Sequence, residues 1–581
     1  MLGTFKKINF LITKTQKKRL TILIILLFIG MVMEVFGLGI LIPTISIILD
    51  PEKIEKTPFI YSIRTYFSEF SDQIFVFLFL GLIVLIYFLK SIFVIFLTYK
   101  QNRFLNNTIS SISNNLFASY LSKPYDFHLR RNSSELIKNI QIEMNYFYAF
   151  LLSLINIFVE SGFVFSVLIT LIYIEPFGAI CIGVFYGLLS LIFFQFTKRK
   201  LKQWGKLRKE LDEEISKLSL EGLGGIKELL VFGKVNFFIN EYTKKNFSRA
   251  RLIANHGTVS QIPRFYLEFI SITGLVTFII ILLATGSDTL SLITVLGVFV
   301  AGTFRMIPSL NRIIASSQSI KYYRPSLEII FNEIYSNKQI IISDKPNNDF
   351  NFKNQIKFDN VNFSFSPGIP ILTNINIEIS KGQTIGIIGE SGTGKSTFVD
   401  LLIGLHKPTE GNIYIDGIKD FQFNQSWKKK IGYVSQSIYL LDDSIKNNIA
   451  FGFLEEEIDF VRINKIIKNV QLEDFINTLE LGVETKVGER GIQLSGGQRQ
   501  RIAIARALYN DPELLIFDEA TAALDTQTEN DLINAIYELK GEKTIVMIAH
   551  RLSTLNRCDQ IYEIKKGNLN NIEKSILKNQ I

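Results

Sequence analysis

The chain has 581 residues, of which 48% are hydrophobic and 20% are charged. This length exceeds what one hydrophobic core can serve, so several domains are predicted. A formal net charge of +9 would suit a nucleic-acid partner, but the basic residues cluster beside long apolar runs in residues 1–310, as the flanks of membrane helices do. We therefore expect a membrane protein that has no nucleic-acid partner. The two cysteines offer no disulfide framework.

Residues 1–335 are predicted to form an all-α membrane domain. Each of their apolar runs is near the roughly 20 residues that a bilayer-spanning helix requires. Long basic segments alternate with very short ones between the runs, and the positive residues favour a cytoplasmic place for the long segments, as helical extensions of the spans. Both chain ends are then cytoplasmic. The six predicted spans are 20–49, 74–98, 149–174, 177–196, 264–285 and 289–307.

A polar linker is predicted at 336–354 and a soluble domain at 355–581. The linker is rich in Asn, Asp, Ser and Lys. The soluble domain opens with two runs in which apolar residues alternate with polar ones, a pattern that predicts half-buried strands. The apolar positions are Ile356, Phe358, Val361, Phe363 and Phe365 in the first run, and Ile375, Ile377 and Ile379 in the second.

A glycine-rich stretch lies between the apolar runs 384–388 and 398–403, which predicts a strand, a loop and a helix. It fits the pattern G-x-x-x-x-G-K-[ST]. The glycines let backbone N–H groups turn toward a polyanion, Lys395 would reach the β- and γ-phosphates, and Ser396 would bind Mg²⁺. The sequence thus predicts a nucleoside triphosphate site formed by Gly389, Glu390, Ser391, Gly392, Thr393, Gly394, Lys395, Ser396 and Thr397.

Two acidic residues end the apolar run 514–517, which has the character of a buried parallel strand. Such a strand in a nucleotide-binding sheet ends at the phosphate site. Asp518 is predicted to hold Mg²⁺, and Glu519 is predicted to act as general base on the attacking water.

A second anion-binding turn is predicted at residues 495–498, directly before a helix over 499–508. Two glycines and a serine at the start of a helix suit a bound anion. One domain can wrap only one face of the γ-phosphate, so we expect this turn to serve the nucleotide of a second copy in a homodimer. Its residues are Ser495, Gly496, Gly497 and Gln498.

Together these motifs resemble those of the ATP-binding cassette (ABC) proteins, and the order of segments resembles that of ABC exporters with six spans and one cassette. The resemblance covers nearly the whole chain. It implies a multidomain fold, with an all-α six-helix transmembrane domain followed by an α/β P-loop NTPase cassette that has an antiparallel β subdomain and an α-helical subdomain. It also implies ATP hydrolysis coupled to transport, with ATP and Mg²⁺ as cofactors.

The same resemblance assigns further roles. Gln436 would sense Mg²⁺ and the γ-phosphate, and His550 would contact the γ-phosphate. Asp525 would lie at the dimer contact. Phe365 stands where a tyrosine usually stacks on adenine, and a phenyl ring can stack in the same way.

Residues 261–268 and 304–314 resemble a narrower group, the bacterial flippases of lipid-linked oligosaccharides, in the exporter branch that includes lipid A flippases. This resemblance implies a multi-pass protein of the bacterial inner membrane with a cytoplasmic cassette. It also implies flipping of a lipid-linked oligosaccharide or related glycolipid by alternating access.

Four cationic residues in or beside the predicted spans favour an anionic cargo. Charges at membrane depth usually face a cavity or a partner, and arginine suits phosphate. We expect a basic cavity for a pyrophosphate-linked glycan, while anchoring of the spans at the cytoplasmic surface is the alternative explanation. The residues are Lys90, Arg264, Arg305 and Arg312.

Two other functions stay open on the sequence alone. One is export of peptides or hydrophobic drugs, which an anion-binding set of cations fits less well. The other is a membrane-tethered ABC ATPase that transports nothing, against which the predicted spans count.

Overall fold

The computed structural model describes residues 2–49, 72–174, 176–284, 289–337, 350–366, 368–519, 526–549 and 552–572. The chain divides into two compact units, one of residues 1–123 and 128–341 and the other of residues 124–127 and 342–581. The division at residue 341 falls within the predicted linker, most of which lies outside the described residues.

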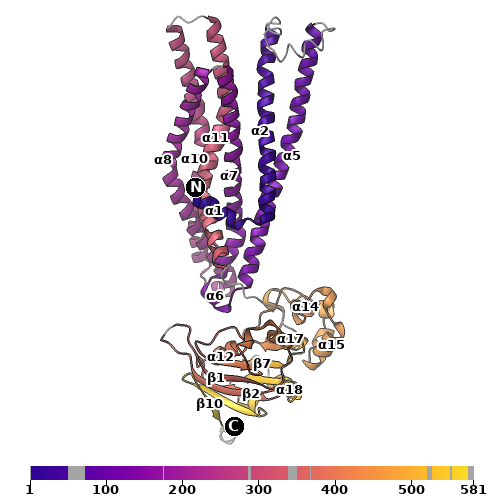
Figure 1. Ribbon diagram of the computed structural model, residues 1–581. Helices are drawn as coiled ribbons and strands as arrows, with labels where there is room; N and C mark the ends of the chain where they lie inside the picture. The colour runs from indigo at the N-terminus through magenta and orange to yellow at the C-terminus, as the bar shows by residue number, and fades with distance from the viewer. Residues whose placement is uncertain are drawn as a thin grey trace. The chain divides into compact units, whose positions relative to one another are not determined.

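The first unit is built from long helices (Figure 1). Each predicted span falls on a different helix, and five of these helices run far beyond their apolar stretch. Each of these helices continues after its apolar run ends, and the extensions carry polar residues. The helices over residues 2–337 are α1 (Leu2–Leu11), α2 (Lys14–Leu49), α5 (Asp72–Leu121), α6 (Tyr125–Arg130), α7 (Ser133–Ile174), α8 (Pro176–Gly224), α9 (Ile226–Val231), α10 (Val235–Ala284) and α11 (Thr289–Asn337). Residues 125–127 of α6 belong to the second unit.

Helices α2 and α5 lie side by side and diverge from α7, α8, α10 and α11 toward one end of the unit (Figure 1). Leu23 and Leu27 of α2 pack against Leu97 of α5. A Cβ atom on Gly30 would lie 3.2 Å from the Leu97 side chain, so this glycine permits the close approach. The other four helices share a separate apolar cluster, which includes Val167, Tyr186, Leu267 and Met306.

Two helical stretches among the described residues are long and apolar enough to cross a bilayer. They are Leu80–Leu121 on α5 and Ser133–Ile169 on α7. Large apolar side chains such as Phe77, Phe165 and Phe269 are exposed on the helices of this unit, which suits contact with lipid. These features are typical of a membrane protein.

The second unit contains two sheets (Figure 1). The four-stranded sheet is antiparallel with the order β2-β1-β4-β5, and the six-stranded sheet has the order β10-β9-β3-β8-β7-β6 with only β10 antiparallel to its neighbour. The strands are β1 (Gln355–Phe363), β2 (Leu372–Ser380), β3 (Thr384–Ile388), β4 (Glu410–Ile415), β5 (Ile418–Lys419), β6 (Ile431–Val434), β7 (Leu514–Asp518), β8 (Thr544–Ile548), β9 (Gln560–Lys565) and β10 (Asn568–Ile572).

Two apolar clusters fill this unit. One joins both sheets to α12, where Phe358 of β1 stacks on Phe398 with ring centroids 4.9 Å apart. The other joins the six-stranded sheet to a group of helices around α17. The predicted α/β cassette with an antiparallel subdomain and a helical subdomain is thereby confirmed. Its α-helices are α12 (Lys395–Leu402), α13 (Gln425–Lys428), α14 (Ile445–Ile449), α15 (Phe460–Asn469), α16 (Glu473–Asn477), α17 (Gly496–Tyr509) and α18 (Thr526–Glu538).

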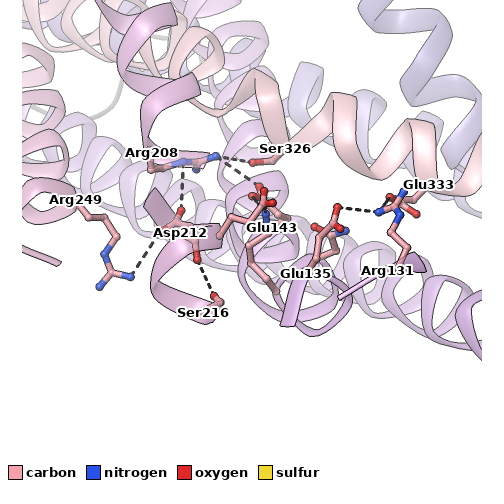
Figure 2. A network of polar contacts seen from close by, with 12 residues as sticks. Arg131, Glu135, Glu143, Arg208, Asp212, Ser216, Arg249, Ser326 and Glu333 are labelled. Carbon is pink, nitrogen blue, oxygen red and sulfur yellow. Dashed lines mark hydrogen bonds and ion pairs between the residues drawn. The ribbon is translucent and has the colours of Figure 1, made fainter. Parts of the chain in front are cut away.

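A buried ionic cluster holds the first unit together where the helices have left the apolar stretch (Figure 2). Arg208 of α8 is fully buried, 3.6 Å from the Glu143 carboxylate of α7 and 3.7 Å from that of Asp212. It also donates a hydrogen bond of 3.0 Å to the Ser326 hydroxyl of α11. Arg249 of α10 lies 3.6 Å from Asp212, so four helices contribute to one cluster.

Aromatic packing completes the surroundings of Arg208. The guanidinium lies over the Tyr146 ring, 3.7 Å from its centroid, which is a favourable cation–π geometry. Nearby, a Cβ atom on Gly205 would lie 2.3 Å from the Tyr322 carbonyl oxygen, so only glycine allows α8 and α11 to approach this closely. Burial raises the pKa of Asp212, although the positive charge of Arg208 opposes that rise.

We expect an Arg208→Met variant to be strongly destabilised, by about 3–5 kcal/mol, because it removes the buried guanidinium that Glu143 and Asp212 share and leaves them with their more distant or more exposed partners, Lys138 and Arg249. The exposed Lys217, which pairs with Glu221 one helical turn away, provides the control. Lys217→Met should cost less than about 1 kcal/mol. Thermal unfolding of both variants in detergent measures the difference, and equal midpoints would contradict the role of the buried cluster.

Candidate functional site

The predicted phosphate loop lies between β3 and α12, and its glycines are required by its backbone. Gly394 precedes the helix with φ of 106°, where a side chain is disfavoured. A Cβ atom there would lie 2.9 Å from the Leu372 side chain, and one on Gly389 would lie 2.5 Å from the carbonyl oxygen of Ile564. The helix begins at Lys395, three residues before the apolar run that predicted it.

Lys395 is buried and its ammonium group points back across the loop. It donates hydrogen bonds to the carbonyl oxygens of Gly389, at 2.7 Å, and Glu390, at 3.0 Å. The Thr393 hydroxyl donates to the same Glu390 oxygen at 2.9 Å. Two backbone carbonyl dipoles therefore compensate the charge of Lys395. The phosphate oxygens of a bound nucleotide would take the place of these carbonyls.

A hollow of about 930 Å³ surrounds this loop. Residues 390–397 line one side, Gln436 and Glu519 contribute to the lining, and the turn between β9 and β10 supplies Lys565 and Lys566. The sequence does not predict this part of the lining, because no local pattern shows that the chain comes back to the loop 170 residues after Lys395. The volume suits a nucleotide, and the added lysines favour an anionic one.

The two predicted acids lie at the end of β7, beside this loop. Glu519 has φ of 51°, which is uncommon for a residue other than glycine, asparagine or aspartate, and its carboxylate accepts a 2.6 Å hydrogen bond from the Gln436 amide. Gln436 is thereby joined to the predicted general base by direct contact. Backbone strain of this kind is typical of functional sites.

Asp518 has the surroundings of a cation ligand. Its Oδ1 atom is buried without a hydrogen-bond partner, and the side chain also bonds to the Ser396 hydroxyl. Burial, with the negative charge of Glu519 as a second cause, raises the pKa of Asp518 to about 6. Oxygen ligands of this kind fit Mg²⁺, which uses one or two protein groups together with phosphate oxygens.

The predicted second turn is the N-terminus of α17. The Ser495 hydroxyl accepts a hydrogen bond from the Gln498 N–H at 3.2 Å, and the Gln498 side chain accepts one from the Ser495 N–H at 2.8 Å. This capping box fixes the turn. None of the residues 495–498, which include Gly496 and Gly497, is among those lining the hollow at the phosphate loop.

The remaining nucleotide-site predictions are only partly described. Phe365 lies just beyond the end of β1 and is 43% exposed, packed edge-on against Phe363 at 5.0 Å between centroids. The side chain is therefore partly accessible to a base. Asp525 and His550 lie outside the described residues.

The predicted cargo-binding cations lie on three helices of the first unit. Lys90 on α5 is buried, with its ammonium 4.9 Å from the centre of the Tyr87 ring. Arg264 on α10 pairs with Glu268, one turn along the same helix, at 3.1 Å. The side chain of Arg305 lies outside the described residues.

Arg312 has a partner that the sequence analysis did not identify. Its guanidinium lies 3.1 Å from the carboxylate of Glu160, which belongs to α7 and is only 13% exposed. An acidic residue inside a predicted span costs free energy unless it has a partner. The position of Glu160 within the span 149–174 was therefore the available sign in the sequence that such a partner exists.

The loop, its two acids and the glutamine define a nucleoside triphosphatase cassette, and the chain joins it to a helical membrane unit. The protein belongs to the ABC transporters. Residues 372–522 match the family described as ABC transporter, and residues 20–307 match the ABC transporter transmembrane region. It is an ABC exporter half-transporter that hydrolyses ATP.

Individual relatives agree with this assignment. An ATP-dependent lipid A-core flippase of Wigglesworthia glossinidia brevipalpis is 32% identical over 473 residues, which are 79% of each chain. A leukotoxin translocation ATP-binding protein, LktB, of Mannheimia glucosida is 44% identical over 216 residues, 37% of this chain and 30% of the relative. The solved structure of a bacterial Atm1-family ABC exporter with ATP bound has a TM-score of 0.76 at 24% identity, covering 97% of this chain and 96% of the other, which shows the shared fold.

The raised pKa of Asp518 predicts a pH dependence of Mg²⁺-dependent ATP binding. A proton on this carboxyl competes with the metal, because metal ligands must be deprotonated. As pH falls below about 6, the apparent affinity for Mg²⁺ should drop by up to about tenfold per pH unit from this group alone.

Calorimetric titration of the protein with ATP and Mg²⁺ at a series of pH values measures this effect. Asp518→Asn is the control, because residue 518 cannot titrate in this variant, whereas the phosphates of ATP titrate in both experiments. The assignment would be wrong if the two proteins lost affinity in parallel over the whole pH series.

Proposed function

We propose that this protein flips an amphipathic, anionic lipid-linked substrate across the bacterial inner membrane, using alternating access in a homodimer. A lipid-linked oligosaccharide or a related glycolipid is the favoured cargo. Likeness to a lipid A-core flippase over 79% of both chains supports a lipid substrate. The likeness to the leukotoxin translocator covers 37% of this chain and therefore carries little information about cargo.

The observation that carries the cargo proposal is the ion pair of Arg312 with Glu160. A guanidinium in a membrane domain needs a counter-charge, and Glu160 supplies one while no cargo is bound. The phosphate groups of a lipid-linked glycan can take over the same guanidinium, because arginine binds phosphate in a two-pronged geometry. Lys90, Arg264 and Arg305 are proposed to add to this anion-binding set.

In the cassette, we assign the chemistry to the residues that line the loop. Lys395 exchanges its two backbone carbonyl partners for the β- and γ-phosphates. Glu519 exchanges Gln436 for the attacking water and takes its proton, while Gln436 turns to the γ-phosphate. When bound, Mg²⁺ at Ser396 and Asp518 would neutralise charge that develops on the phosphates.

A second chain is proposed to complete the site. The turn at Ser495–Gln498 would cover the open face of the nucleotide on the partner cassette, with Asp525 at the dimer contact and His550 on the γ-phosphate. We propose a membrane domain of residues 1–335 with six spans, and a cassette of residues 355–581. Both termini and the cassette would lie in the cytoplasm.

The Glu519→Gln variant tests the assigned base. We expect it to bind ATP and to hydrolyse it at least about 100-fold more slowly, because a positioned general base contributes that much. It should also accumulate as an ATP-bound dimer. Glu563→Gln is the matched control, since Glu563 lines the same hollow from β9. Single-turnover hydrolysis and size-exclusion chromatography with ATP measure both effects, and rapid turnover by Glu519→Gln would overturn the assignment.

The pair of substitutions Arg305→Ala and Arg312→Ala tests the cargo site. Flipping of a lipid-linked glycan in vesicles should fall at least about tenfold, which corresponds to losing charge-assisted hydrogen bonds to phosphate. Basal ATP hydrolysis should persist. Arg324→Ala is the control, because Arg324 lies further along the same helix and pairs with Glu328. Unchanged flipping by the folded double variant would show that these cations do not form the cargo site.

A further inference from the structure

A basic hollow of about 620 Å³ lies where the short helix α1 meets α2. Lys6 of α1 and Lys14 and Lys17 of α2 line it, together with the amide side chains of Asn9 and Asn115. All of these side chains can donate hydrogen bonds, and three of them carry a positive charge. The hollow is therefore built to receive an anion.

The three lysines have no anionic partner among the described residues. Their neighbour Lys7 does have one, Glu328 of α11. Aromatic packing of Phe10 against Phe331, with centroids 5.5 Å apart, further fixes α1 to α11. The hollow is thus a fixed feature of the unit with an uncompensated charge.

Apart from Thr13, the rest of the lining is apolar, and three of its residues are buried. Ile112 of α5 is 2% exposed, and Leu11 and Ile12 at the junction of α1 and α2 are 7% and 8% exposed. On the outer side of α1, the Phe5 ring is 60% exposed. Donors above an apolar floor, beside an exposed aromatic ring, are typical of the interface between a membrane and water.

The depth of the hollow matches lipid headgroups. The first predicted span begins at residue 20, three residues after Lys17 and six after Lys14. At 1.5 Å per residue the two lysines lie about 4.5 and 9 Å before the span begins. The headgroup layer on each side of a bilayer is about 5–8 Å thick. A phospholipid of the adjacent leaflet can therefore place its phosphate beside both lysines.

We propose that this hollow binds the headgroup of one anionic phospholipid from the cytoplasmic leaflet. The proposal depends on the membrane location of α2 and not on the identity of the cargo. Each lining lysine that donates a charge-assisted hydrogen bond to the lipid phosphate should add roughly tenfold in affinity, which exceeds the gain of about fivefold that a lysine near a membrane surface adds through charge alone. A phospholipid is favoured over a free phosphate ion because the apolar floor would contact glycerol and the upper acyl chain, which a free ion lacks.

A pair of charge-matched variants tests the site. Lys14→Gln with Lys17→Gln removes two lining lysines, whereas Lys18→Gln with Arg19→Gln removes two adjacent exposed cations that do not line the hollow. The full-length protein is placed in vesicles of phosphatidylcholine alone or mixed with phosphatidylglycerol. Native mass spectrometry of the protein released from them then measures the retained phosphatidylglycerol.

We expect the lining variant to lose at least about 100-fold in affinity for phosphatidylglycerol, because it loses hydrogen bonds to the phosphate, and the control variant, which loses surface charge alone, to lose no more than about 30-fold. Equal losses would overturn the proposal, because they would mean that diffuse surface charge attracts the lipid. Competition by inorganic phosphate at concentrations comparable to the lipid would also overturn it, because the hollow would then bind a free ion. Thermal unfolding midpoints of both variants that match the parent protein verify that the comparison is made on folded protein.

Discussion

A charge that is removed from water must be compensated, and this requirement determines where the charged residues of the protein lie. Arg208 meets it in the helical unit, where two carboxylates, a hydroxyl and an aromatic ring surround one guanidinium. The contacts come from α7, α8 and α11, so one guanidinium links three helices (Figure 2). Burying ions costs free energy. The main effect of the cluster is therefore to specify one arrangement of the helices, and its net contribution to stability is smaller.

The cassette meets the same requirement in a different way. Lys395 is compensated by two backbone carbonyls, and Glu519 by the Gln436 amide, which are weak partners compared with an opposite charge. Asp518 remains partly uncompensated, as its raised pKa indicates. Weak partners are easily exchanged, and a triphosphate with its metal offers each of these groups a stronger one. The difference between Arg208 and Lys395 is therefore the difference between a permanent structural contact and a replaceable one.

The sequence predicted the parts of the site that lie within single motifs. The loop, the two acids and the turn before α17 were recognised because their spacing is fixed by local backbone geometry. The strand pattern also contained a signal, since the step of three from Phe358 to Val361 marks the irregular register between β1 and β2. By contrast, Glu160, the turn at Lys566 and the charge cluster around Arg208 depend on contacts between distant segments. A local pattern can mark Glu160 as a costly acid inside a span, but it does not identify the partner, so these contacts required the three-dimensional structure.

The arrangement of α17 gives a physical reason for the proposed dimer. Its capping box already satisfies the Ser495 and Gln498 groups that a nucleotide could otherwise recruit within the chain. The first turns of the helix keep free N–H groups, which attract an anion from outside. None of these residues lines the hollow at the phosphate loop of the same chain. An anion-binding turn that is structurally complete and lies outside the hollow of its own chain is what the proposed dimer requires.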